Sequence, residues 1–471
     1  MRVRTALFGV AMLFVGCDVP EAQFVSSEPF NGLAPEARRA VKAELEDKFG
    51  TPDDLVGWLR FPINYGGVTG SVASVAESGP ITSFTVELAP DATLDVQRDS
   101  LLKWQSGAYR DVDIPIPVRG FDAQSNVLTI GAELEKPPNV GDTFVIDGGM
   151  KFKHGKQLYL KHCMHCHGVT GDGNGPTAKY LNPLPRDYRQ GVFKFTSTAQ
   201  TDRARRDDLG RTIKYGIPGT YMPSFMLLED QEVDAIVEYI RWLSVRGEYE
   251  RRLVNEFEGD YSKEAITDRT SGEDGEDRDA IIAELQVFLD EDFPDIVEGI
   301  ADDLATAWSR AEEEPALILP EKPRTADDAA LASRLRGRQL YLSERAKCAS
   351  CHGPRGVGDG PQTELFQKIP GTNDDYDKPG LYNVWGDPID PRNLNRGIYR
   401  GGRRPIDIYR RIYAGIKGTP MPAFGGTVLK DEEIWDLVNY VMSIPYDGPE
   451  PQASGSSEEL ASTGAHAGGR Q

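Results

Sequence analysis

The stretch Cys163-Met-His-Cys166-His167 has a counterpart later in this 471-residue chain, Cys348-Ala-Ser-Cys351-His352. In both, two cysteines are separated by two residues and followed directly by a histidine. Downstream of each lies a Met-Pro pair in similar text, Gly216-Ile-Pro-Gly-Thr-Tyr-Met222-Pro and Gly415-Ile-Lys-Gly-Thr-Pro-Met421-Pro. The chain therefore carries one pattern twice.

A Cys-x-x-Cys-His run is the spacing at which two thiols capture the vinyl groups of one haem while the histidine binds its iron. We therefore expect two covalently attached c-type haems, one on Cys163 and Cys166 and the other on Cys348 and Cys351. Of the five cysteines only Cys17 is then left, so no disulfide framework is needed. Paired thiolates also bind zinc, which is the alternative interpretation.

Each expected haem has a candidate ligand on its far side. The pairs are His167 with Met222 and His352 with Met421. Histidine and methionine together raise a haem's potential and suit the transfer of single electrons. Core packing is the competing role of any methionine, and Met226, four residues from Met222, is the rival ligand.

The other histidines and the last methionine receive structural interpretations. His162 and His165 lie beside and within the first attachment loop, and we interpret both as surface residues. His154 could bind iron only if the preceding helix were rearranged. Met442 lies on a predicted helix and is interpreted as a core residue.

The two halves match beyond these motifs. Gly155-Lys-Gln-Leu-Tyr159-Leu and Gly337-Arg-Gln-Leu-Tyr341-Leu precede them, and Pro185-Arg186-Asp187 corresponds to Pro391-Arg392-Asn393. Apolar residues three and four positions apart predict a closing helix in each half, over residues 229–243 and 430–444. An internal repeat with two homologous domains follows.

Residues 151–250 and 335–446 resemble class I cytochromes c, in which the first and last helices cross through a small residue and an aromatic one. Gly155 with Tyr239, and Gly337 with Tyr440, stand at the matching positions.

The resemblance also implies residues around the haem. A Gly-Pro carbonyl accepts the hydrogen bond of the iron-binding imidazole in that family, which places Pro176 and Pro361 in this role. By the same analogy Arg186 and Arg392 are candidates to hold the haem propionates.

Outside the repeat, only residue patterns guide the assignment. Residues 18–58 form a predicted helical segment, with a helix over 34–49. Residues 59–150 alternate in short runs such as Phe84-Thr-Val86-Glu-Leu88, which predicts a small β domain, a sandwich or a barrel. The fold class is therefore mainly α in two class I cytochrome c domains, 151–255 and 335–446, with an N-terminal all-β domain and an acidic helical linker over 256–334. Residues 447–471 are predicted to be a disordered tail.

The linker carries most of the chain's negative charge. Residues 256–315 hold 21 acidic and 4 basic residues, against a whole-chain charge of −21. Its first part, through Thr270-Ser-Gly-Glu-Asp-Gly, is interpreted as flexible, and its second part as two amphipathic helices divided near Pro294. Residues 151–214, by contrast, hold 13 basic and 5 acidic residues. Two hypotheses remain open: the acidic helices are a solvated spacer, or they dock on this basic surface and gate access of an acidic partner.

The N-terminus resembles an export signal of a bacterial lipoprotein. Arg2 and Arg4 precede an apolar run from Ala6 to Val15, and Cys17 follows as the residue that would carry the lipid. No later stretch has the roughly 20 apolar residues that span a bilayer. The expected location is the periplasmic face of a bacterial membrane, with the lipoprotein-type signal over residues 1–17 cleaved so that the lipid-bearing Cys17 becomes the first residue.

These features favour a periplasmic, membrane-anchored dihaem cytochrome that transfers single electrons between respiratory redox proteins. No catalytic residue is evident, so we expect a carrier rather than an enzyme, and no nucleic-acid partner. Two alternatives remain. One is a dihaem peroxidase with one open iron, and the other is a docking subunit of a respiratory membrane complex whose β domain is the binding module.

Overall fold

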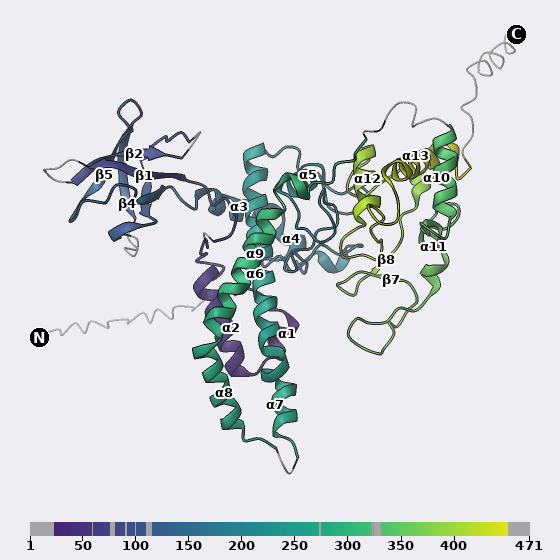
Figure 1. Cartoon of the computed structure of the whole chain (residues 1–471), viewed down its shortest axis with the longest axis horizontal. Coiled ribbons are helices and arrows are strands. Elements are labelled where there is room, and N and C mark those ends of the chain that lie inside the picture. The colour runs from purple at the N-terminus through teal and green to yellow at the C-terminus, as the bar shows by residue number, and fades with distance from the viewer. Residues whose placement is uncertain are drawn as a thin grey trace, which may run out of the picture.

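The computed structural model describes residues 23–58, 60–75, 81–89, 92–98, 100–109, 115–272, 275–322, 324 and 331–450. Cys17 and the export signal lie outside these residues, as does the chain after residue 450. Figure 1 shows, from left to right, a β-barrel, a central helical body that also contains the N-terminal helices α1 and α2, and a second helical unit. None of the helices in the described ranges is long and apolar enough to cross a membrane.

The barrel confirms the predicted all-β domain. Its strands are β1 (Val68–Val75), β2 (Ile81–Leu88), β3 (Leu101–Trp104), β4 (Ile116–Asp122), β5 (Val127–Leu134) and β6 (Thr143–Ile146), with the 3₁₀ turn η1 (Gly107–Tyr109). They close in the order β1-β2-β5-β4-β3-β6 through antiparallel pairs. Alternate residues such as Phe84 and Val86 are buried, which is the period-2 pattern of a strand with one inward face. Phe144 and Trp104 fill the centre.

One long helix, α6 (Asp230–Tyr261), organises the central body. The sequence predicted its end at residue 243, but the helix continues because its second half is also covered. Packed on it are α1 (Glu28–Gly32), α2 (Pro35–Phe49), α7 (Lys263–Thr270), α8 (Arg278–Glu291) and α9 (Phe293–Arg310). The helix predicted over residues 34–49 is thus confirmed as α2, which buries Val41, Leu45 and Phe49 at helical spacing.

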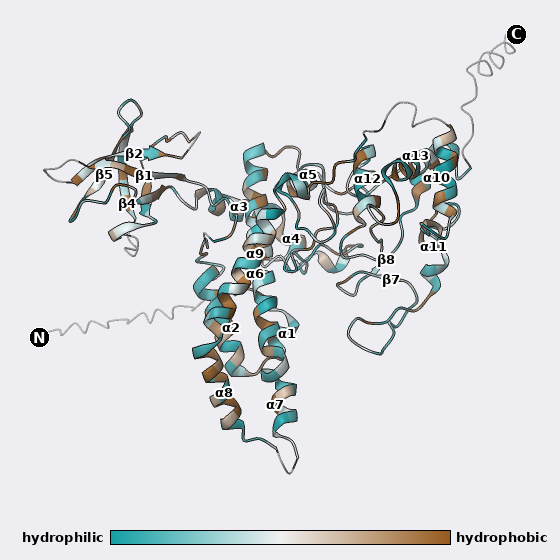
Figure 2. Cartoon of the chain, in the orientation of Figure 1, coloured by the Kyte–Doolittle hydropathy of each residue, from teal (hydrophilic) through white to brown (hydrophobic). Residues whose placement is uncertain are grey.

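The acidic segment is neither flexible at its start nor a solvated spacer. Residues that were expected to be a loose linker form the end of α6 and all of α7. The two predicted amphipathic helices are confirmed as α8 and α9, with Pro294 in the first turn of α9. Figure 2 shows apolar residues on α8 among hydrophilic ones. Ile281, Leu304 and Trp308 are fully buried in the same core as α6, so apolar contact holds these helices despite their charge.

Each half of the repeat builds the same set of helices. The first repeat (residues 151–255) contains α3 (Met150–His162), α4 (Met164–His167), the 3₁₀ turn η2 (Ala178–Tyr180), α5 (Arg206–Tyr215) and the first part of α6. The second repeat (residues 335–446) contains α10 (Leu331–Leu342), α11 (Cys348–His352), α12 (Pro405–Ala414) and α13 (Asp431–Asp447). Short elements η5 (Pro361–Glu364), β7 (Leu381–Tyr382), β8 (Pro388–Ile389) and η6 (Leu394–Arg396) lie between α11 and α12.

The predicted crossing of first and last helices is present in both repeats. A β-carbon on Gly155 of α3 would overlap the carbonyl oxygen of Ala235 in α6, and one on Gly337 of α10 would overlap that of Asp436 in α13. Close approach of two backbones requires a residue without a side chain at this point. The aromatic partners Tyr239 and Tyr440 are buried at the same crossings.

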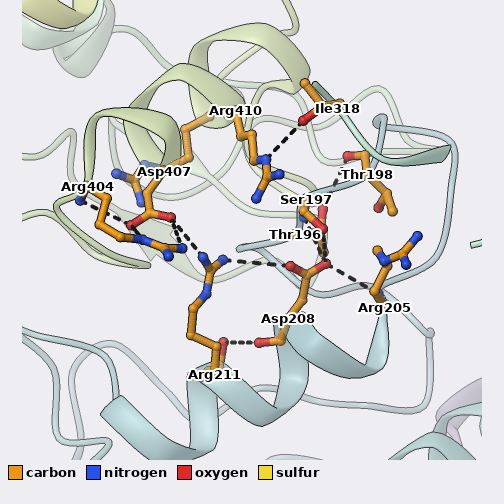
Figure 3. Close-up of polar contacts among 12 residues, drawn as sticks. Thr196, Ser197, Thr198, Arg205, Asp208, Arg211, Ile318, Arg404, Asp407 and Arg410 are labelled. Carbon is orange, nitrogen blue, oxygen red and sulfur yellow. Dashed lines mark hydrogen bonds and ion pairs between the residues drawn. The ribbon is translucent and has the colours of Figure 1, made fainter. Parts of the chain in front are cut away.

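Helices α5 and α12 bring the two repeats together. Arg211 of α5 forms ion pairs with Asp407 of α12 at 2.8 Å and with Asp208 of its own helix at 3.7 Å. Figure 3 shows Arg211 between these two carboxylates, both of which are buried. Lys417 of the second repeat donates to the Thr198 hydroxyl of the first at 2.9 Å. Polar contacts therefore fix the arrangement of the two repeats.

Candidate functional site

The first cavity lies between α4, the loop after η2 and the loop between α5 and α6. Its volume is about 170 Å³. All four predicted haem residues of the first repeat line it: Cys163, Cys166, His167 and Met222. Cys163 lies at the end of α3, and Cys166 and His167 lie in α4. One turn of helix therefore presents both thiols and the imidazole to the same space.

The second cavity repeats this arrangement with a volume of about 240 Å³. It is lined by Cys348, Cys351 and His352 from α11 and by Met421 from the loop after α12. Four apolar side chains from α12 and α13 form part of the remaining wall: Ile408, Ile412, Leu437 and Val441.

The two imidazoles are held by the repeated Pro-Arg turn. Nδ1 of His167 donates to the carbonyl oxygen of Arg186 at 3.0 Å, and Nδ1 of His352 donates to that of Arg392 at 3.1 Å. Because a carbonyl oxygen can only accept, Nδ1 of each ring carries the proton. Nε2 of each ring therefore keeps a free electron pair that can bind iron. Burial lowers the pKa of His167 to about 4, and it also lowers the pKa of His352. Both rings are thus neutral at pH 7, the form that binds iron.

The role predicted for Pro176 and Pro361 is wrong. Neither proline lines its cavity, and the acceptor for the imidazole is one turn further along the chain. The Gly-Pro turn instead supports the attachment loop from behind, since the N–H of Gly175 donates to the carbonyl of Cys166 at 3.1 Å and that of Gly360 to the carbonyl of Cys351 at 3.0 Å. The family resemblance suggested the correct bond but assigned it to the wrong Pro-containing turn.

The methionine loops have the same backbone conformation in both repeats. Ile217 N–H donates to the carbonyl of Met222, and Ile416 N–H to that of Met421, each at 3.2 Å. A threonine two residues earlier also accepts from each methionine N–H. The rival Met226 is 60% exposed and does not line the cavity. Met442 packs against the core of the second repeat, as the sequence indicated.

One histidine was placed incorrectly from sequence. His162 lines the first cavity, packs edge-on to Phe225 with ring centroids 5.9 Å apart, and buries an Nε2 that has no hydrogen-bond partner among the described residues. His165 and His154 are exposed, as expected for surface residues. The motif itself does not distinguish His162 from its neighbours, because the helical phase of α3 turns His162 toward the cavity.

The predicted propionate-holding arginines both line a cavity, Arg186 the first and Arg392 the second. The guanidinium of Arg186 stacks 3.6 Å above the ring of Trp385, which belongs to the second repeat. Burial lowers the pKa of Arg186 to about 10. Nε of Arg392 donates to the carbonyl of Ile398 at 2.8 Å, which orients its guanidinium.

The two sites differ in what lies against the imidazole. Tyr188 stacks on His167 with ring centroids 4.7 Å apart and an interplanar angle of 20°. Leu394 stands at the corresponding position of the second repeat. A buried tyrosine hydroxyl supports both attachment loops, from Tyr159 to the carbonyl of Gly168 at 2.8 Å and from Tyr341 to that of Gly353 at 2.7 Å.

Sequence reasoning missed three residues that line both cavities: Lys194, Phe195 and Arg400. A signal was present, because the repeated runs that begin at Gly191 and Gly397 each end in a basic residue, Lys194 and Arg400. Nε of Arg400 is buried and has no hydrogen-bond partner in the described part of the chain.

The residues of each cavity fit a covalently attached haem. In each cavity two thiols, a neutral imidazole and a thioether converge on one apolar space. Arg400 lines both cavities and His162 lines the first, and Nε of Arg400 and Nε2 of His162 are buried without a hydrogen-bond partner among the described residues. The four described cysteines form no disulfide, and the two pairs line different cavities, so they do not combine into one four-thiolate zinc site. Within the described ranges, no group of three or more His, Cys, Asp or Glu side chains could hold a metal ion by itself.

The match to a family model agrees with the two cavities. The cytochrome c family model matches the chain twice, over residues 152–244 and 335–445. No curated protein matches the chain significantly. A solved structure from Kuenenia stuttgartiensis, described as a reducing HAO-like protein complex, aligns at 26% identity over 62% of this chain and 96% of its own, with a TM-score of 0.40.

Proposed function

Since the chain is a c-type cytochrome with two cytochrome c domains, whose haem chemistry is electron transfer, we propose that each domain carries one haem and that the protein relays single electrons between redox proteins. One observation carries this proposal. In both cavities a methionine faces the same space as the two cysteines and the histidine, so each iron would have both axial positions filled.

Bound haem supplies a one-electron couple at its iron, and the chain's own side chains decide how that couple behaves. His167 and His352 would be the proximal ligands, oriented by the carbonyls of the Pro-Arg turns. Met222 and Met421 would be the distal ligands, held by their hydrogen-bonded loops. Apolar walls exclude water, which limits rearrangement when an electron arrives or leaves.

The absorption spectrum of the purified holoprotein tests the proposal. The spectrum of the reduced protein is recorded before and after addition of carbon monoxide, and the oxidised protein is examined for a methionine-to-iron charge-transfer band as a sign of Met ligation. If both axial positions of each iron are filled by protein ligands, carbon monoxide is expected to leave the reduced spectrum unchanged. Rapid binding to one haem in the native protein would overturn the carrier and favour a peroxidase-type enzyme with an open iron.

We further propose that the protein is anchored by a lipid on Cys17 at the periplasmic face of a bacterial membrane and exchanges electrons with respiratory partners there. The order of features in residues 2–17 supports this proposal: basic residues come first, then an apolar run, then a cysteine. Attachment of c-type haem also fits an exported protein. A Cys17→Ser variant is expected to leave the membrane fraction while it still takes up haem. Recovery of the variant in the membrane fraction at the native level would contradict the anchor.

A further inference from the structure

The two cavities share one wall. Lys194 and Phe195 of the first repeat and Arg400 of the second line both of them. The contact is close, since a β-carbon on Gly401 would overlap the ring of Phe195. No helix therefore separates the two cavities at this point, and a group that fills either cavity contacts the same three side chains.

Lys194 and Arg400 occupy matching positions of the repeat. Lys194 follows Gly191-Val-Phe193, and Arg400 follows Gly397-Ile-Tyr399. Both repeats thus present a cation to the other's cavity as well as to their own. Two more arginines contact the opposite repeat. Arg186 lines the first cavity and stacks on Trp385 of the second repeat. Arg392 of the second repeat places its guanidinium against Gly219 in the methionine loop of the first repeat.

Positive charge is in excess at this wall. Burial and then the charges of Arg186 and Arg400 lower the pKa of Lys194 to about 7, with the charge of Asp387 acting in the opposite direction. Burial and the charge of Arg392 likewise lower the pKa of Arg400, and only Asp390 acts against them. Cations gathered in a partly buried place need anions to offset the cost of desolvation. Haem carries two propionates, so two haems would bring four carboxylates to this cluster.

We propose that Lys194 and Arg400 form a shared cationic wall, which holds propionates of both haems and couples the two redox sites within one chain. The inference rests on the proposed dihaem function. The step it serves is the passage of one electron from the ferrous iron of one repeat to the ferric iron of the other, with no bond made or broken and no proton required. A charge at the wall acts on both haems, because a positive charge favours the reduced state of any haem near it.

Redox potentiometry of the full-length holoprotein tests the wall. The haem absorbance is titrated at pH 6, where Lys194 is charged, and both midpoint potentials are fitted for native protein and for Lys194→Gln and Arg400→Gln. Each variant is expected to lower both potentials together. Lys153→Gln removes the same charge from an exposed position of α3 that lines neither cavity, and is expected to move neither potential.

A shift of only one potential in both variants would assign each cation to a single haem and overturn the proposal, as would no shift. If Lys194→Gln fails to take up haem, Arg400→Gln and the charge-retaining Lys194→Arg decide the matter, the latter by keeping both potentials at the native values. The readout is separate from the test of function, because the potentials are measured whether or not one haem also binds carbon monoxide.

Discussion

Arg211 of the first repeat pairs with Asp407 of the second at 2.8 Å, and the carboxylate of Asp407 also accepts from Arg404 at the start of its own helix. The pair joins α5 to α12 beside the wall shared by the two cavities. Its integrity determines whether the two sites keep their mutual arrangement, which makes it the first target for a test.

Asp407→Asn is expected to destabilise the protein by about 1.5–3 kcal/mol at pH 6, because the buried carboxylate loses its charge-assisted bonds to Arg211 and Arg404, whose side chains are 26% and 59% exposed. The free energy of unfolding is measured by urea titration of the haem absorbance. Glu344→Gln, at a side chain that is 97% exposed, is the control and should change little. Equal stability of Asp407→Asn and native protein would contradict the structural role of the pair.

The same pair predicts an acid dependence. Burial raises the pKa of Asp407, but hydrogen bonding from Arg404 and the charge of Arg211 outweigh it and hold the pKa below 3.8. A lowered carboxyl pKa stabilises the folded state above the unfolded pKa near 3.9, and this contribution is lost as pH falls through the folded value. The stability difference between native protein and Asp407→Asn should therefore shrink below about pH 4.

Gly155→Ala should destabilise the first repeat by about 1–3 kcal/mol, because the added methyl overlaps the α6 backbone at the helix crossing. Gly259→Ala is the matched control. It lies on α6 with open space around it, and alanine there should stabilise the helix by about 1 kcal/mol. Thermal unfolding of both variants is compared with native protein, and a lower midpoint for Gly259→Ala than for Gly155→Ala would refute the crossing.

Met222→Ala should open one haem to carbon monoxide without removing the haem, because the thioether is the side chain placed to fill the distal position of the first cavity. Met226→Ala, at an exposed side chain four residues later, should bind none. The reduced spectrum with and without carbon monoxide distinguishes them. If Met226→Ala binds carbon monoxide and Met222→Ala does not, Met226 is the ligand and the two assignments must be exchanged.

Leu304→Ala in α9 should destabilise the central body by about 3 kcal/mol, since Leu304 is fully buried in the core shared with α6. Val287→Ala in α8 removes a similar side chain that is 53% exposed and should cost less than about 1 kcal/mol. Urea unfolding gives both values. A native-like Leu304→Ala would restore the view of this acidic segment as a spacer.

Sequence alone determined what depends on local chemistry. The spacing of two cysteines and a histidine, repeated at Cys163 and Cys348, indicates the attachment of haem because three groups on one turn of helix must meet one ring. Glycines at 155 and 337 mark the helix crossings, and the alternation in residues 84–88 marks a strand of the barrel. The attachment and strand signals lie within a few residues of the structure they specify. The two glycines were instead placed by the family resemblance, because each contacts a helix far along the chain, at Ala235 and Asp436.

The tertiary structure decided what depends on contacts between distant segments. The acidic helices are core elements because α6 offers them an apolar face, which their charge count concealed. The acceptor for His167 is the carbonyl of Arg186. Sequence patterns did not identify it, because a backbone carbonyl has no sequence signature. Lys194 and Arg400 line one shared wall only because α5 and α12 pair the repeats, and no pattern within either repeat specifies how two domains meet.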